Sequence, residues 1–175
     1  MARSSLADKR DYALLRLALT TGRRAQEFCN LTWKDIRIHG LGLEITFLCK
    51  GNKTMRDQVG KQTREALESY LHALYGASLA SLDKNTPIFV SLSRNNYGKA
   101  LSTQALSNIC QKHLGFSQFH TTRHTFAMSM KKAGASISDI SKRLGHSDEK
   151  TTRAYIAQQE SAINPHINAL EAMFG

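Results

Sequence analysis

Apolar positions at helical spacing predict that most of this chain is helical. The pattern is clearest over 61–75, where one face carries Ala66, Leu67, Tyr70, Leu71 and Leu74. Residues 7–20 are also helical in pattern, and Thr21-Gly22 ends them. Their apolar positions (Tyr12, Leu15, Leu17 and Leu19) are too dense for one narrow stripe, which predicts a well-buried helix. Further helices are expected just after Arg23 and at 103–114, 120–133, 136–144, 148–158 and 163–174.

Alternation of apolar and polar residues predicts two strands. Leu43, Ile45 and Phe47 alternate with more polar neighbours in 43–48, and Gly51-Asn52 is a strong signal for a two-residue hairpin turn. A second, antiparallel strand is therefore expected over Lys53–Val59. The fold class that follows is mainly α with a small antiparallel β-hairpin or sheet (α+β), and 77–100 is expected to be mostly loop.

Length and charge narrow the class of protein. The 175 residues suit one domain with its own core, which we expect to span 1–175. There is no run of eighteen apolar residues and no apolar segment in MARSSLADKR, so neither a membrane span nor a signal peptide is expected. The net charge of +10 favours a polyanionic partner such as nucleic acid.

The cysteines indicate neither a metal site nor a disulfide framework. They are odd in number and widely spaced, without a C-x-x-C pattern: Cys29, Cys49 and Cys110. We expect reduced thiols, no metal and a cytoplasmic protein.

The last third of the chain holds the candidate chemistry. In HTTRH, His120 and Arg123 lie three residues apart, so a helix places a proton carrier beside a guanidinium that matches phosphate oxygens. Tyr155, nine residues after His146, is a candidate oxygen nucleophile. Each residue alone has a plainer structural explanation. His120 could cap its helix, His124 could be a core histidine, and Tyr155 could be a buried aromatic.

Four motifs together resemble the tyrosine recombinases of the phage integrase family. They are TGRRAQEFCNLTWKDI at 21–36, the lysine hairpin KGNKTMRDQV at 50–59, HTTRHTFA at 120–127 and LGHSDEKTTRAY at 144–155. They occur in the family's order over residues 10–157, and the order makes the resemblance specific. It implies that the chain has the fold of the family's catalytic domain.

The resemblance assigns roles position by position. The implied catalytic residues are Arg24, Lys50, His120, Arg123, His146 and Tyr155, with Glu27 and His124 in supporting positions. Lys53 is a rival of Lys50 for the role of general acid. Arg23 stands where the family usually has an apolar residue, so the choice between Arg23 and Arg24 rests on which one points inward. Thr121-Thr122 and Val59-Gly60 also depart from the family pattern without removing a catalytic group.

The implied reaction is metal-free DNA cleavage by Tyr155, which leaves a 3′-phosphotyrosine and needs no cofactor. The implied partners are double-stranded DNA and other copies of the chain in a tetrameric synapse, with the helix 163–174 as the candidate contact between copies. That helix could equally pack on its own core. The protein is expected to act at the nucleoid of a prokaryotic or phage-infected cell. Because the family's N-terminal DNA-clamping domain is missing, a fragment or a minimal protein is expected.

Two other functions remain open. One is a type IB topoisomerase-like enzyme, which uses the same chemistry to relax DNA. The other is a DNA-binding module without catalysis.

Overall fold

The computed structural model describes residues 4–39, 42–146 and 149–161, and the chain divides into two compact units. The first unit covers residues 1–126 and the second covers 127–175. The boundary falls within helix α5 (His120–Lys132). Within the described residues, the predicted class is confirmed: helices dominate, and one small antiparallel sheet accompanies them.

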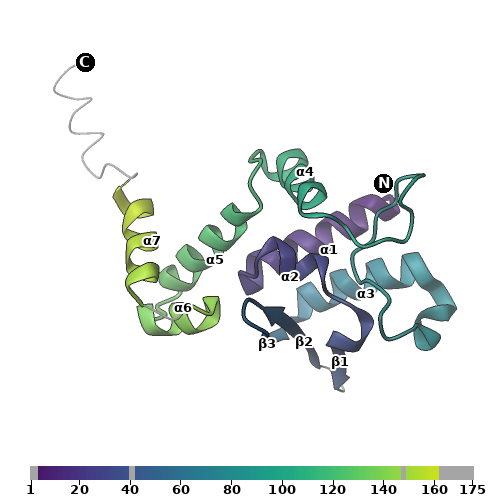
Figure 1. Cartoon of the computed structure of the whole chain (residues 1–175), viewed down its shortest axis with the longest axis horizontal. Helices are drawn as coiled ribbons and strands as arrows, with labels where there is room; N and C mark the ends of the chain where they lie inside the picture. The colour runs from purple at the N-terminus through teal and green to yellow at the C-terminus, as the bar shows by residue number, and fades with distance from the viewer. Residues whose placement is uncertain (1–3, 40–41, 147–148, 162–175) are drawn as a thin grey trace, which may run out of the picture. The chain divides into compact units, whose positions relative to one another are not determined.

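The first unit is built around helix α1 (Leu6–Thr21), which lies beside α3 (Lys61–Tyr75) in Figure 1. Ser5 and Asp8 form a capping box at the start of α1, and Gly22 ends it in the left-handed conformation with φ of 63°. The dense apolar pattern is buried at Leu15 and Leu17, but Tyr12 is 56% exposed, so its expected burial was wrong. Tyr12 instead stacks under the Arg16 guanidinium at the surface.

The sheet has three strands in the order β1-β2-β3: β1 (Ile36–His39), β2 (Gly42–Cys49) and β3 (Lys53–Val59). The predicted hairpin is confirmed, because β2 and β3 pair antiparallel, but its turn has three residues, 50–52, and not the two that were expected. Gly51 and Asn52 both have positive φ (76° and 58°). Strand β1 was not predicted. It has only four residues, IRIH, and they are mostly exposed, including Ile38, so it has no buried face of the kind that marks a half-buried strand.

Aromatic rings join the other elements of the first unit. Phe28 of α2 (Ala25–Cys29) lies 5.5 Å from the ring of Phe47 on β2, 6.2 Å from Phe89 and 5.4 Å from Phe119, measured between centroids. These packed rings connect α2 with the sheet, with the loop after the 3₁₀ turn η2 (Gly76–Ser81), and with the start of α5. A second 3₁₀ turn, η1 (Trp33–Asp35), leads into β1.

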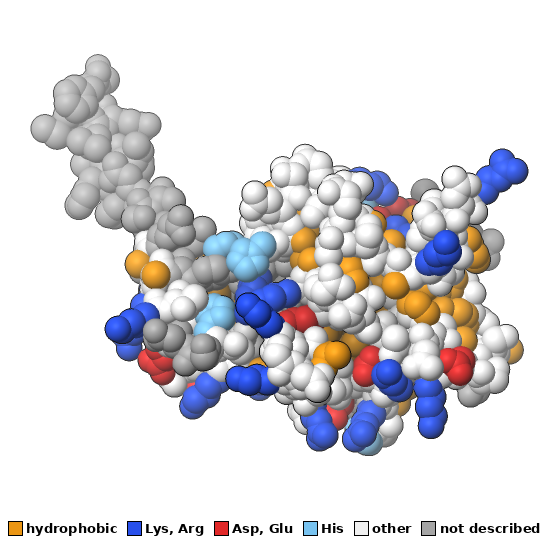
Figure 2. Space-filling model, in the orientation of Figure 1, with side chains coloured by type: hydrophobic (Ala, Val, Ile, Leu, Met, Phe, Trp, Pro, Cys, Tyr) orange, Lys and Arg blue, Asp and Glu red, His pale blue; other side chains and the backbone are white. Residues whose placement is uncertain are grey.

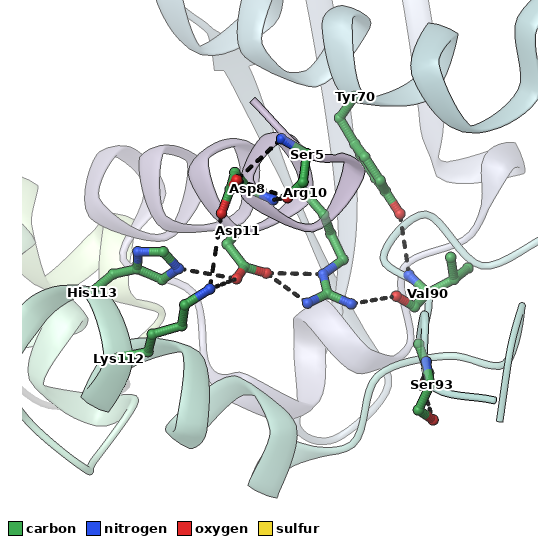
Figure 3. Close-up of polar contacts among 10 residues, drawn as sticks. Ser5, Asp8, Arg10, Asp11, Tyr70, Val90, Ser93, Lys112 and His113 are labelled. Carbon is green, nitrogen blue, oxygen red and sulfur yellow. Dashed lines mark hydrogen bonds and ion pairs between the residues drawn. The ribbon is translucent and has the colours of Figure 1, made fainter. Parts of the chain in front are cut away.

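A buried carboxylate fixes α4 (Thr103–Leu114) to α1. Figure 3 shows Arg10, Lys112 and His113 around Asp11, which is 2% exposed. Arg10 also donates to the carbonyl of Val90 at 3.0 Å. This network belongs to the scaffold, since it holds the 88–101 segment and α4 against α1.

The second unit contains the rest of α5, α6 (Ile137–Leu144) and α7 (Glu149–Ser161). The predicted capping box between Ser136 and Asp139 starts α6, and Gly145 ends it with φ of 65°. Apolar residues of α6 and α7 are buried: Ile140, Leu144 and Ile156. The helix predicted at 163–174 lies outside the described residues. None of the described helices is long and apolar enough to cross a membrane.

Candidate active site

The turn at residues 22–24 is the centre of the candidate site in the first unit. Gly22 has a left-handed backbone, and a Cβ added to it would lie 2.3 Å from the Phe126 ring, so only glycine fits. The Gly22 carbonyl accepts a hydrogen bond of 2.7 Å from Nη1 of Arg123. A backbone group of this turn therefore orients a guanidinium that lies 101 residues further along the chain.

Arg24 is held at the surface by a buried acid. Oε2 of Glu27 accepts from the Arg24 backbone N–H at 2.8 Å, and Oε1 accepts from Nη1 at 3.2 Å. The Arg24 side chain is 38% exposed, whereas that of Glu27 is 5% exposed. Glu27 thus closes the first turn of α2 and directs the guanidinium outward, where it can meet an anion.

Arg23 is the arginine that points inward. Its Nε and Nη2 donate to the two carboxylate oxygens of Asp57 on β3 at 2.6 and 2.7 Å, and both side chains are buried. Within the first unit, Arg23 is therefore buried and Arg24 lies at the surface, and the catalytic role of Arg24 stays a prediction. The role of Asp57 was missed, because nothing local in β3 marks an acid that pairs across the fold.

His120 and Arg123 lie in the first turns of α5, as predicted. Arg123 is 1% exposed, whereas His120 lies at the surface. Partial desolvation of the His120 ring, followed by the positive charges of Arg123 and Arg24, lowers the pKa of this histidine. The two arginines are therefore its electrostatic neighbours, and they favour the neutral form of His120.

His124 supports His120 from the next turn of α5. The two rings are 5.0 Å apart between centroids and stand edge to face at 86°. Desolvation, then the charges of His120 and Arg123, lowers the pKa of His124 as well. The ring is half-buried, and its supporting role stays a prediction.

Lys50 is exposed in the turn after β2, and Lys53 is exposed at the start of β3, opposite Cys49. Burial and then the Glu27 carboxylate raise the pKa of the Cys49 thiol, with Arg23 and Arg24 acting in the opposite direction. The turn end of the hairpin, where Cys49 pairs with Lys53, therefore lies near the acid that holds Arg24. Both lysines stay candidates for the general acid.

His146 and Tyr155 belong to the second unit. His146 follows the left-handed Gly145, and its backbone N–H donates to the Ser141 carbonyl in the manner of a Schellman motif. Its Nδ1 lies 2.8 Å from Oγ1 of Thr152, which is fully buried on α7. Tyr155 lies on α7 three residues after Thr152. Thr152 was missed by the sequence analysis, although it stands within the same motif.

Basic side chains are exposed on the sheet of the first unit. Figure 2 shows Lys and Arg side chains along the lower edge of this unit, where Figure 1 places the sheet. The exposed basic residues of the strands and their turn are Arg37, Lys50, Lys53 and Arg56. Such a surface suits phosphate groups. Among the described residues, no three His, Cys, Asp or Glu side chains gather as a metal site would require.

Comparison with known proteins identifies what the chain resembles. Residues 1–162 match the phage integrase family. A tyrosine recombinase XerC from Thermodesulfovibrio yellowstonii is 34% identical over 157 residues, covering 84% of this chain and 50% of that protein. A tyrosine recombinase XerD from Halalkalibacterium halodurans is 34% identical over 152 residues, covering 83% of this chain and 48% of that protein.

One solved structure supports the same fold. The XerH site-specific recombinase bound to difH substrate, in a pre-cleavage complex, superposes with a TM-score of 0.75 at 18% identity, covering 100% of this chain and 48% of that chain. The chain spans about half the length of the relatives that it matches.

Proposed function

The chain belongs to the phage integrase family, and from this premise we propose that it is the catalytic domain of a site-specific DNA recombinase. It cleaves and rejoins DNA through a 3′-phosphotyrosine. The observation that carries the proposal is the arrangement in the first unit. A buried Glu27 holds Arg24 outward, and Arg24 and Arg123 both act on the pKa of His120. Two cations can stabilise charge on the phosphate oxygens, and a neutral histidine beside them can accept the proton of the nucleophile.

In the proposed reaction, the oxygen of Tyr155 attacks the scissile phosphorus, and the bond from phosphorus to the 5′-oxygen breaks. The phenol proton passes to His120, whose lowered pKa keeps it neutral and able to accept. The 5′-oxygen leaves with the electron pair and takes a proton from Lys50, or from Lys53. The phosphotyrosine ester conserves the bond energy, so rejoining can proceed as the reverse of the cleavage reaction.

The arginines stabilise the charge that builds up on the phosphate oxygens. Arg24 reaches out from α2, and Arg123 is oriented by the Gly22 carbonyl. In comparable oxyanion sites, loss of one such donor costs about 2.7–4 kcal/mol of transition-state stabilisation. We assign His146 a hydrogen bond from its Nε2 to the same phosphate, since Nδ1 contacts Thr152.

The proposed partners are double-stranded DNA and further copies of the chain. The net charge of +10 and the basic residues on the sheet support binding to a phosphate backbone. The relatives are about twice as long as this chain, so the DNA binding proposed here concerns only the part of a recombinase that this chain matches. Self-association on DNA through residues 163–174, and action at the nucleoid, belong to the same proposal.

A trapping experiment tests the reaction. The 175-residue protein is incubated with a pool of duplexes that carry a nick and a randomised sequence around it, so that the short product strand diffuses away. We expect a covalent protein–DNA adduct that survives denaturation, and none with Tyr155→Phe. If the wild-type protein forms no adduct but still binds DNA, it is a binding module and the proposal is wrong.

A second assay separates exchange from relaxation. Supercoiled plasmid is incubated with the protein, with and without paired copies of a site recovered from the trapped adducts. Exchange between paired sites supports a recombinase. Relaxation in the absence of any paired site, without exchange, would instead indicate a topoisomerase.

A further inference from the structure

We propose that Arg23 and Asp57 are positioning residues, which hold the hairpin that carries Lys50 in register with the turn that carries Arg24. This inference deepens the proposed function and rests on it. Neither side chain touches DNA in the proposal. They act through the residues that do.

The geometry of the pair is restrictive. The two Arg23–Asp57 hydrogen bonds, of 2.6 and 2.7 Å, form a parallel fork between a planar guanidinium and a planar carboxylate. The Arg23 guanidinium also lies over the Phe47 ring, 5.6 Å from its centroid. A fork fixes distance and orientation together, which a contact between apolar side chains does not.

The pair joins two backbone segments that both lead to proposed catalytic groups. On one side, Arg23 stands between Gly22, whose carbonyl binds Arg123, and Arg24 itself. On the other side, Asp57 is opposite Ile45 in the β2–β3 ladder, which runs without interruption to the pair Cys49 and Lys53. Because this ladder is continuous, fixing Asp57 also fixes the turn that contains Lys50.

Stability alone does not account for the pair. Moving two charges out of water is costly, and apolar residues of similar volume often replace a buried ion pair without loss of stability. The Arg23–Asp57 pair is surrounded by apolar core residues, including Phe47 and Ile45, which are each 0% exposed. A pair of apolar side chains would also pack there. What the ion pair adds is a defined orientation between the turn and the hairpin.

The test compares an apolar replacement with a matched control. The double variant R23L/D57V removes both charges together, so no unpaired charge stays buried. The control is Asp11→Asn, which weakens another buried ionic contact of the first unit, where Arg10 and His113 meet Asp11 on α1. Each protein is first checked for a cooperative melting transition. An Asp57→Asn variant serves as a second probe that keeps the shape of the carboxylate.

Two readouts are measured on the folded proteins. The first is amide hydrogen exchange of residues 45–57 relative to α1 and α3. The second is the single-turnover cleavage rate with a saturating concentration of a duplex that carries the site recovered from the trapped adducts, together with the Kd for that duplex. We expect R23L/D57V to exchange faster in the hairpin alone. Its cleavage should slow by about 10- to 100-fold, as a displaced catalytic group does, with little change in Kd. Asp57→Asn should change both readouts in the same direction, and Asp11→Asn should change neither.

The outcomes separate this inference from the proposed function. A folded R23L/D57V protein with wild-type hairpin exchange, or with a wild-type cleavage rate, overturns the positioning role. Absence of cleavage by the wild-type protein overturns the proposed function and with it any effect of the pair on catalysis. The exchange measurement still supports or overturns the part of the inference that concerns the hairpin. An equal loss in Asp11→Asn would show a general effect of destabilisation and would also overturn the inference.

Discussion

At the scale of single residues, two of the proposed catalytic groups, Arg24 and His146, are each held by a buried polar partner. Glu27 is buried and Arg24 is exposed, and Thr152 is buried while His146 is only half-buried. A buried partner with a fixed position orders the exposed group before any ligand arrives, which lowers the cost of binding in the correct geometry. The buried partners Glu27 and Thr152 are therefore as much part of the proposed site as the groups that would face the substrate.

His120 should give the cleavage rate a characteristic dependence on pH. Desolvation and the nearby Arg123 and Arg24 lower its pKa below the ordinary value of about 6.5. As the proposed proton acceptor it must be neutral, so the single-turnover rate should be constant from about pH 7 to about pH 9, below the range in which a lysine general acid loses its proton. The rate should fall as the pH drops through the lowered pKa.

The matching variant is His120→Asn, which should reduce the rate by about 10²- to 10⁴-fold and remove the fall at low pH. His124 also titrates in this range, because its pKa is lowered too. His124→Gln is therefore the control and should keep the pH profile of the wild type. A His120→Asn protein with the same profile as the wild type would contradict the assignment.

Thr152 should matter through its hydroxyl group. Thr152→Val keeps the shape of the side chain but removes the contact of 2.8 Å with Nδ1 of His146. Loss of one such hydrogen bond is typically worth about 0.5–1.5 kcal/mol, so we expect a rate about 2- to 10-fold lower in cleavage assays. Thr152→Ser retains the hydroxyl group and should stay near the wild-type rate. Equal rates for the valine and serine variants would mean that the hydroxyl group does not position His146.

At the scale of elements, sequence patterns identified what local rules determine. The helices with caps and glycine stops appeared where expected, as at Ser136–Gly145, and so did the Gly51-Asn52 hairpin. Strand β1 was missed because it has only four residues and its side chains mostly face solvent, although it pairs with the adjacent strand β2. In the same way, the sequence placed Arg23 and Arg24 side by side, but only the tertiary contact with Asp57 determines which one is buried.

The turn between α1 and α2 offers a stability test. Gly22→Ala places a Cβ in the left-handed region and 2.3 Å from the Phe126 ring. Gly115→Ala, at the end of α4, has the same backbone penalty at φ of 77° but open space around the added carbon. The backbone term is about 1–2 kcal/mol for either variant. The clash should add about 1–3 kcal/mol for Gly22→Ala alone.

Chemical denaturation measures both free energies of unfolding. The difference between the two variants isolates the steric contact, because their backbone terms cancel. Equal destabilisation would show that Phe126 moves away at no cost, and the close packing of this turn would then not be a constraint.

At the scale of the whole molecule, the proposed catalytic residues are distributed over two compact units. Arg24, Lys50, His120 and Arg123 belong to the first unit, and His146 and Tyr155 belong to the second. Four sequence motifs in the order of one family predict this set, and the catalytic roles stay a prediction. The buried contacts of Asp57 and Thr152 required the structure, because each partner lies elsewhere in the chain or outside the helix.

The C-terminal residues should contribute to assembly. Their apolar spacing (Ile167, Leu170, Phe174) suits docking on another protein surface. We expect that removal of residues 163–175 weakens assembly on DNA with paired sites, measured by sedimentation of protein–DNA complexes. Binding to a single site should change little. Unchanged assembly would rule out a role of this segment between copies.

The outer strands of the sheet have a consequence for handling the protein. Within the described residues β1 and β3 form the two edges, where unpaired backbone groups could recruit strands from other molecules. β1 is only four residues long and exposes Arg37 and His39 beside Ile38, and β3 exposes Lys53 and Arg56. The positively charged edges of two molecules repel one another. The side chains that suit a nucleic acid backbone thereby also discourage fibre formation when the protein is concentrated without it.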